Sequence, residues 1–311
     1  MQKKTIRIAS RASKLALIQT EYIRKELLNK NPELEISIVK VTTKGDRDKS
    51  EFLYKAGAIG FFTAEIEKYL LDDKADIAVH SLKDLPTASS KGLIIAAIPK
   101  RQSPAEAIVY SKPITGVPDL PTGATVGTSS PRRIAQLKHI RNDLNCVPLR
   151  GNVETRVNKV LSGQIDAAIL ACAGLGRLGL AQKISAILPV TEFLPAPGQG
   201  ALAVQIREND DELNRIVSQL NDSQTRIAVE TERQILAAMQ GGCSIPLGVL
   251  AQIDGGLLTV NAVISDLEGK KFIMLSKTGP VIEAEKLAKV VVDELFRNGA
   301  KEILEQIKSE K

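Results

Sequence analysis

The stretch ADIAVHS, residues 75–81, places an acidic residue directly before a short apolar run, and QIDAAILA, residues 164–171, repeats this chemistry. Both runs are typical of buried strands in an α/β sheet. Similar elements precede the two runs. Before the first run we predict strands at 6–9 and 33–41 and helices at 14–29 and 62–71. Before the second run we predict strands at 124–127 and 145–149 and helices at 132–140 and 153–161. The sequence therefore predicts an α/β fold with two lobes of similar build.

Pro- and Gly-rich stretches at 99–104 and 194–200 predict two crossings between these lobes. Two crossings imply a discontinuous first lobe, residues 1–99 and 200–218, in which 201–206 returns as a strand to the first sheet. The second lobe is then 105–194. Residues 222–311 are expected to form a small α+β domain, with a helix at 222–240, strands within 247–277 and a helix at 281–307. We expect two periplasmic-binding-protein-like lobes flanking a cleft, followed by this third domain.

Composition is ordinary for a globular protein, and charge alone does not decide its ligand. The chain has 311 residues and a net charge of +6, which suits an anionic partner but is mild for an obligate nucleic-acid binder. The first residues contain no apolar leader and no stretch has the length of a membrane span, so we expect a cytoplasmic protein without membrane contact. The spacing of the three cysteines and two histidines favours neither a disulfide nor a zinc site.

Five arginines follow predicted strands or lie near helix starts, in the segments GTSSPRR, LRGNVETR and AGLGR. They are Arg132, Arg133, Arg150, Arg156 and Arg177. Guanidinium groups and the N–H groups of helix N-termini both bind carboxylate or phosphate oxygens. The alternative for each arginine is a solvated side chain or a weak surface ion pair. The pattern favours an anion site without deciding which anion it binds.

Asp84 lies in VHSLKDLP, just past the carboxyl end of the strand predicted at 75–79, where open α/β sheets bind ligands. An Asp in such a turn is commonly a helix cap or an ion-pair partner, here for Lys83. The functional alternative is a carboxylate that stabilises a cation or transfers protons at a reacting centre.

Cys243 lies in QGGCSIP, where two glycines allow the backbone or a ligand to approach closely. Cys146 and Cys172 lie in apolar strand patterns and are expected to be small buried residues. Cys243 fits that expectation less well, and it is a possible nucleophile or attachment point.

The segment 42–60 is rich in glycine and charged residues, among them Lys55, and has no clear period. It is either a solvated linker or a lid that closes over an anionic ligand.

Together these segments resemble the porphobilinogen deaminase family over essentially the whole chain. The motifs that carry the resemblance are SRASKLALIQ, KGD, ADIAVHSLKDLP, VGTSSPRR, LRGNVETR, LACAGLGRLGL, PAPGQGALAVQ and GGCSIPLG, in that order.

The resemblance implies an enzyme that joins four porphobilinogen molecules head to tail, with loss of four ammonia molecules, to give hydroxymethylbilane. It implies a covalent dipyrromethane cofactor attached to Cys243 through a thioether, and it assigns the catalytic carboxylate to Asp84. Because each pyrrole ring carries an acetate and a propionate, it also accounts for the number of arginines. Cofactor and substrate binding is carried over to Arg11, Ser13, Ser81, Lys83, Thr128, Ser129, Ser130, Arg132, Arg133, Arg150, Arg156, Gly174, Arg177 and Gln199, with Lys55 in the lid.

One departure concerns the lid, where Ile59 stands at a position that is usually a second lysine in the family and cannot bind a carboxylate. A different class of protein, a non-catalytic two-lobed anion receptor, would leave Cys243 and the third domain without a purpose. A nucleic-acid binder is disfavoured because the chain has only six Phe and four Tyr for base stacking and its arginines lie in separate turns. The resemblance favours a monomer.

Overall fold

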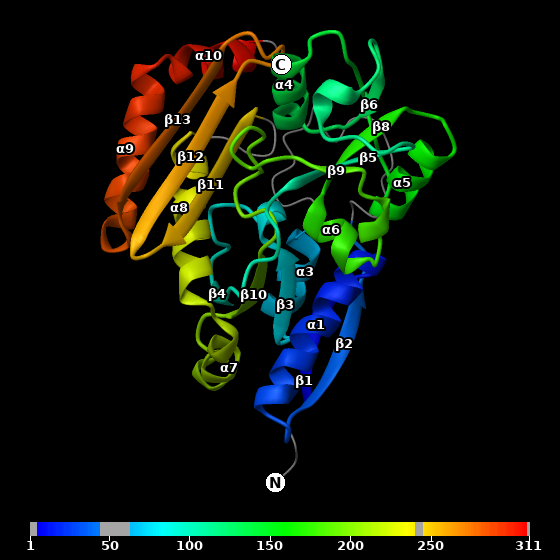
Figure 1. Ribbon diagram of the computed structural model, residues 1–311. Coiled ribbons are helices and arrows are strands. Elements are labelled where there is room, and N and C mark those ends of the chain that lie inside the picture. The colour runs from blue at the N-terminus through cyan, green and yellow to red at the C-terminus, as the bar shows by residue number, and fades with distance from the viewer. Residues whose placement is uncertain (1–4, 44–62, 240–244, 310–311) are drawn as a thin grey trace. The chain divides into compact units, whose positions relative to one another are not determined.

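The computed structural model describes residues 5–43, 63–239 and 245–309 (Figure 1). The chain forms two compact units, Met1–Gln102 with Ala201–Arg226 and Ser103–Gly200 with Ile227–Lys311. Two of the three breaks between the units, after Gln102 and after Gly200, fall at the predicted crossings, and the third, after Arg226, lies within α8 (Ser223–Ala238). The three-domain division stays a prediction, since the second lobe and the C-terminal domain belong to one unit.

The first unit contains a five-stranded sheet in the order β2-β1-β3-β10-β4. Its strands are β1 (Thr5–Arg11), β2 (Glu35–Val41), β3 (Ile77–Ser81), β4 (Leu93–Ala97) and β10 (Leu202–Arg207). Its helices are α1 (Lys14–Lys30), α3 (Ala64–Leu71) and α7 (Asp211–Val217), with short 3-10 turns η2 (Leu82–Asp84) and η5 (Ser218–Leu220). Strands β1, β2 and β3 are parallel, and β10 pairs antiparallel with β3 and β4. The expected return of 201–206 to the first sheet is confirmed.

Apolar side chains alternate along β3, so each face of this sheet has its own core. Ile77 and Val79 pack with Ile23 and Leu27 of α1 on one face, and Ala78 packs with residues of α3 on the other. Helix α1 begins after Ser13, whose Oγ accepts a hydrogen bond from the backbone N–H of Ala16. Strand β1 is longer than the strand predicted at 6–9, because it continues through Arg11.

The second lobe contains a sheet in the order β7-β6-β8-β5-β9. Its strands are β5 (Glu106–Tyr110), β6 (Thr125–Gly127), β7 (Asn145–Val147), β8 (Ala167–Ala171) and β9 (Ala186–Ile187). Its helices are α4 (Pro131–Ile140), α5 (Val153–Leu161) and α6 (Cys172–Arg177), with 3-10 turns η3 (Val117–Asp119) and η4 (Ala181–Lys183). As in the first sheet, three parallel strands are followed by an antiparallel strand, here β5, that enters after a crossing. The prediction of two lobes of similar build is confirmed.

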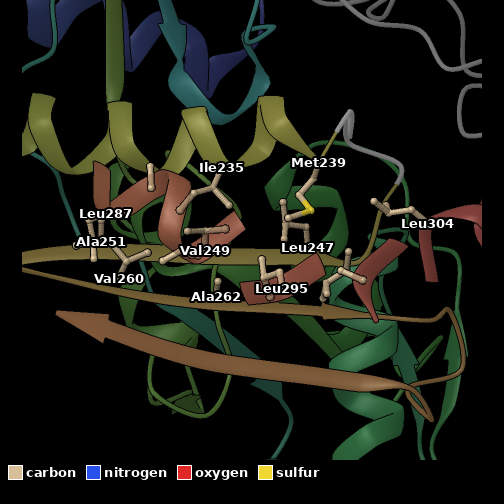
Figure 2. Close-up of a cluster of buried hydrophobic side chains, with 14 of the residues drawn as sticks. Ile235, Met239, Leu247, Val249, Ala251, Val260, Ala262, Leu287, Leu295 and Leu304 are labelled. Carbon is tan, nitrogen blue, oxygen red and sulfur yellow. The ribbon is translucent and has the colours of Figure 1, made fainter. Parts of the chain in front are cut away.

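The C-terminal domain consists of an antiparallel sheet, β11-β12-β13, and three helices. The strands are β11 (Leu247–Asp254), β12 (Leu257–Ser265) and β13 (Phe272–Pro280); the helices are α8 (Ser223–Ala238), α9 (Ala284–Arg297) and α10 (Ala300–Ser309), with a 3-10 turn η6 (Val281–Glu283). Figure 2 shows Ile235 of α8 and Met239, the residue after that helix, directed at the strands, with Leu287, Leu295 and Leu304 from α9 and α10 in the same cluster. The stretch 281–307 is helical, as expected, but it is divided into η6, α9 and α10, and Gly299, which separates α9 from α10, has φ +101°.

The turn between β12 and β13 packs tightly on α4 of the second lobe. Gly269 lies so close that a Cβ atom there would be 2.5 Å from the carbonyl oxygen of Ala135. The rings of His139 and Phe272 stack with centroids 3.7 Å apart, and Lys138 Nζ lies 2.6 Å from Glu268 Oε2. Helix α4 therefore connects the second sheet to the C-terminal domain.

Within residues 5–43, 63–239 and 245–309, no helix combines the length and the apolar composition required to cross a membrane.

Candidate functional site

In the first unit, the predicted site residues gather at the carboxyl edge of the parallel strands. Strand β1 ends at Arg11, just before Ser13, and β3 leads through Ser81 into the turn of Lys83 and Asp84. Because β1 and β3 are parallel neighbours, their carboxyl ends lie at the same edge. The sheet therefore places two cations, a carboxylate and two hydroxyls at the same edge.

Asp84 is the last residue of η2 and is exposed. Among the residues that the structure describes, its carboxylate makes neither a hydrogen bond nor an ion pair. The interpretation of Asp84 as a helix cap is therefore not supported. The carboxylate projects from a turn whose backbone is held by the hydrogen bond from Leu85 N–H to Leu82 O, 3.2 Å.

Ser81 and Ser13 are occupied by local contacts. The Oγ atom of Ser81 lies 3.0 Å from Nε2 of Gln19, and the Oγ of Ser13 caps α1. Both residues stay candidates for ligand binding, but the contacts described here are structural.

In the second lobe, the ends of β6, β7 and β8 form the equivalent edge, because these strands are also mutually parallel. Strand β6 leads through Thr128, Ser129 and Ser130 into α4, and β7 leads through Arg150 into α5. Ser129 joins the two segments, since its Oγ accepts from Leu149 N–H at 3.0 Å and lies 3.1 Å from Leu149 O. Hydroxyls, a half-buried arginine and two helix N-termini therefore share one edge of the sheet.

The two helix starts differ in how their N–H groups are used. Asn152 caps α5, accepting from Thr155 N–H at 2.8 Å. In α4 the N-cap residue Ser130 makes no capping hydrogen bond with its side chain, and Thr128 Oγ1 accepts from Ser130 N–H instead. First-turn N–H groups have no partner inside their helix, so the start of α4 is suited to a carboxylate.

Arg132 and Arg133 have a role that the sequence did not indicate. Both are buried, and both bind Glu106, which is fully buried at the start of β5. Arg132 Nη2 lies 2.6 Å from Glu106 Oε1, and Arg133 Nη2 lies 2.7 Å from Oε2. Their remaining described contacts go to backbone carbonyls, from Arg132 to Leu194 and from Arg133 to Ile169. We had expected these guanidinium groups to bind a ligand, but their described partners are protein groups.

This buried cluster is held by its geometry as well as its charge. Burial lowers the pKa of the Arg132 guanidinium, and the Glu106 carboxylate opposes that shift. A buried charge is tolerated when it is paired and hydrogen-bonded. The cluster thereby ties α4 to β5 and to the second crossing segment.

Arg177 and Gln199 both contact the crossing segments. Arg177 ends α6 rather than starting a helix, and its Nη2 donates to Gly200 O at 2.8 Å. The Gln199 side chain is fully buried and donates to Pro104 O at 2.8 Å. Gly174 lies inside α6 with room beside it, since a Cβ atom there would meet only Val153 Cγ2, at 3.8 Å.

The Arg156 side chain also contacts a backbone carbonyl, because its Nε donates a hydrogen bond to Gly151 O at 2.9 Å. Lys55 and Cys243, predicted as the lid lysine and the attachment cysteine, lie outside the described residues.

The other two cysteines behave as small core residues. Cys172 is buried, and Cys146 is half-buried. Burial raises the pKa of both thiols, that of Cys172 to about 11. Neither has the low pKa of a reactive cysteine.

Sequence reasoning missed three buried polar residues that support these edges, Glu106, Gln205 and Glu67. Gln205 and Glu106 stand inside apolar strands, LAVQIR and EAIVY. A polar side chain in a strand that is otherwise apolar is a usable signal, because burial requires it to have a partner.

Comparison with known proteins supports the resemblance. Residues 6–215 match the family model "Porphobilinogen deaminase, dipyromethane cofactor binding domain", and residues 226–297 match "Porphobilinogen deaminase, C-terminal domain". The chain belongs to the porphobilinogen deaminase family. A porphobilinogen deaminase from Gloeobacter violaceus is 42% identical over 98% of this chain and 94% of its own length. Another, from Synechococcus sp. (strain RCC307), is 42% identical over 100% of this chain and 98% of its own length.

Among solved structures, a TRAP periplasmic solute binding protein from Desulfovibrio salexigens DSM2638 is 10% identical, with a TM-score of 0.44, covering 99% of this chain and 95% of that chain.

The described residues fit the dipyrromethane for which the family model is named. A group with several carboxylates requires hydroxyls, N–H groups and cations at the strand ends. The edge of the second lobe offers Thr128, Ser130 and Arg150, and the first unit offers Arg11 and Lys83. In this porphobilinogen deaminase family member the donors are therefore of the type that the cofactor requires.

Proposed function

We propose that this protein is a transferase that joins four porphobilinogen molecules head to tail, releases four ammonia molecules, consumes one water molecule when the completed tetrapyrrole is hydrolysed from the primer, and so delivers hydroxymethylbilane to tetrapyrrole biosynthesis. Family membership supports the reaction class. The observation that supports the site is Asp84, an exposed carboxylate in the turn after β3 for which the described residues provide no ion-pair partner. An alternative anion receptor without chemistry would not require this carboxylate.

Asp84 is the catalytic residue in this proposal. When ammonia leaves the aminomethyl group of porphobilinogen, positive charge develops on the pyrrole ring. A carboxylate beside the pyrrole N–H stabilises that charge and accepts or returns a proton. Because Asp84 has no competing partner in the described structure, it does not have to break a salt bridge before it acts.

The bound dipyrromethane supplies the terminus to which the first substrate is joined. Cys243 is the proposed attachment residue. The acetate and propionate groups are held by Arg11, Ser13 and Lys83 in the first unit and by Thr128, Ser129, Ser130, Arg150 and Arg156 in the second. Arg132, Arg133, Arg177, Ser81 and Gln199 support these residues through the contacts described above, Gly174 leaves space beside them, and Lys55 belongs to the proposed lid. We place the enzyme in the cytoplasm as a monomer that binds neither nucleic acid nor membranes.

The first test is the intact mass of the purified protein together with product stoichiometry. A dipyrromethane adduct on the Cys243 peptide, with four ammonia molecules released for each hydroxymethylbilane formed, is the expected result. An unmodified Cys243 thiol in fully active protein would refute the proposed attachment.

Asp84→Ala tests the catalytic role. The variant is expected to retain the adduct and to lose about 10²- to 10⁴-fold in kcat, because the carboxylate acts as ammonia leaves. Asp72→Ala is the matched control, since Asp72 is an exposed aspartate at the C-terminal end of α3. Equal kcat values in the two variants would show that the Asp84 carboxylate is not catalytic.

A further inference from the structure

A chain of buried polar side chains lies behind the strand that presents Asp84. His80, Gln205 and Glu67 are each at most 8% exposed and come from β3, β10 and α3. His80 Nε2 lies 3.1 Å from Gln205 Oε1, and Gln205 Nε2 lies 2.9 Å from Glu67 Oε1. Ser90 completes the chain, because its Oγ donates to Glu67 Oε2 at 2.9 Å.

The direction of these hydrogen bonds determines the tautomer of His80. A carboxylate oxygen accepts, so Gln205 Nε2 must be the donor toward Glu67. The amide oxygen of Gln205 then faces His80 and requires a proton on Nε2. Burial lowers the pKa of His80 to about 4, although the hydrogen bond that His80 donates to Gln205 tends to raise it, so the ring is neutral at neutral pH.

The backbone directs Gln205 toward this position. The pairing of β10 with β4 shifts register between Val204 and Gln205. A register shift in an antiparallel pair changes the direction of the side chains beside it. Gln205 pairs with Ala78 in the register of β3, so it lies on the same face of the sheet as His80, two residues farther along β3.

The strand end is held on both faces. Gln19 of α1 contacts the hydroxyl of Ser81 on one face, and Gln205 holds His80 on the other. Leu82 N–H donates to Ala201 O at 3.0 Å, extending the pairing into the turn. The residues directly before Lys83 and Asp84 therefore have little freedom to shift.

We propose that Gln205 is a positioning residue for Asp84: oriented by Glu67, it holds His80 in the Nε2–H tautomer and so fixes the end of β3 from which the Asp84 turn begins. The proposal rests on the proposed function, because its consequence is a change in turnover. A displacement of about 1 Å at a reacting group can cost up to two orders of magnitude in rate.

The test combines imidazole ¹H–¹⁵N NMR with kinetics on the holoenzyme. The chain has only two histidines, so His139→Gln leaves the His80 signals alone in the spectrum. In this background we expect a protonated Nε2 and an unprotonated Nδ1 that do not change from about pH 5.5 to about pH 8. An Nδ1–H signal would overturn the proposal.

Gln205→Met keeps the side-chain length but cannot hydrogen-bond His80 in the same way. We expect mixed His80 tautomers and a kcat reduced on the order of tenfold, with KM within about twofold. Glu67→Gln provides a second variant: it allows the Gln205 amide to turn over, and the same mixed tautomers are expected.

Val204→Ala is the matched control, because Val204 is equally buried on the same strand but packs in the α1-side core. It should lower stability and leave kcat within about twofold of the parent. The positioning role is overturned if Gln205→Met mixes the His80 tautomers and keeps the kcat of the parent. It is also overturned if Val204→Ala lowers kcat as much as Gln205→Met does. Absence of hydroxymethylbilane formation by the unaltered enzyme would instead refute the proposed function.

Discussion

The buried His80 makes the stability of this protein sensitive to acid. Burial lowers its pKa from the ordinary 6.5 to about 4 in the folded protein. Below pH 6.5 the unfolded chain therefore binds a proton that the folded chain excludes. The contribution to stability is fully present above pH 6.5 and is lost progressively as the pH falls toward 4.

The pKa values of His80 in the unfolded and folded states determine how much stability is lost. The whole difference corresponds to about 3 kcal/mol, and between pH 7 and pH 4.5 the loss in the free energy of unfolding is about 2 kcal/mol. The comparison variant is His80→Gln, which removes the ionisable ring while keeping a side chain that can hydrogen-bond Gln205. Asp76 does not interfere: burial tends to raise its pKa, but hydrogen bonds from Arg7 and Arg207 lower it to about 2, so this group titrates below the test range.

Urea unfolding followed by far-UV circular dichroism at pH 7 and at pH 4.5 measures the effect. We expect the free energy of unfolding of the unaltered protein to fall by about 2 kcal/mol more than that of His80→Gln over this interval. Equal losses in the two proteins would show that His80 is not protonated preferentially in the unfolded state, and the reasoning from burial would be wrong.

Three further predictions concern the second unit. Glu106→Gln leaves two buried guanidinium groups without a counter-charge and should cost about 3–5 kcal/mol in urea unfolding; a loss no larger than that of the exposed Glu268→Gln would contradict the buried cluster. Gly269→Ala requires a Cβ 2.5 Å from Ala135 O at φ +71°, so it should lower the melting temperature more than Gly255→Ala, where φ is +54° but nothing lies within 4 Å. Arg150→Lys keeps the charge and loses the guanidinium fork, so we expect less covalent cofactor by intact mass; normal loading would argue against bidentate binding there.

The sequence predicted most of the fold because the relevant signals are local. Strand and helix periods predicted the parallel part of both sheets, and the Pro- and Gly-rich crossings predicted the return of β10. The start of α5 was predicted correctly at Val153, since Asn152 caps it within three residues along the chain. The short strand β9 and the break before α10 were missed, because β9 has only two residues and one glycine breaks an otherwise helical pattern.

The candidate site was predicted less completely. The positions of Asp84 and Lys83 followed from the strand that ends just before them. The partners of Arg132 and Arg133 did not follow, because Glu106 is 26 or 27 residues away and lies on a strand that the sequence did not reveal.

The sequence by itself determined which chemical groups stand at the strand ends, since a strand, its turn and the next helix are neighbours along the chain. Only the tertiary structure decided which of these groups meet a protein partner and which face outward. Arg177 is bound to Gly200, 23 residues away, and Gln205 to Glu67, 138 residues away, whereas Asp84 has no such partner among the described residues. The physical reason is that a buried polar group takes whichever partner the folded chain brings within hydrogen-bond distance, and that choice depends on contacts far apart in sequence.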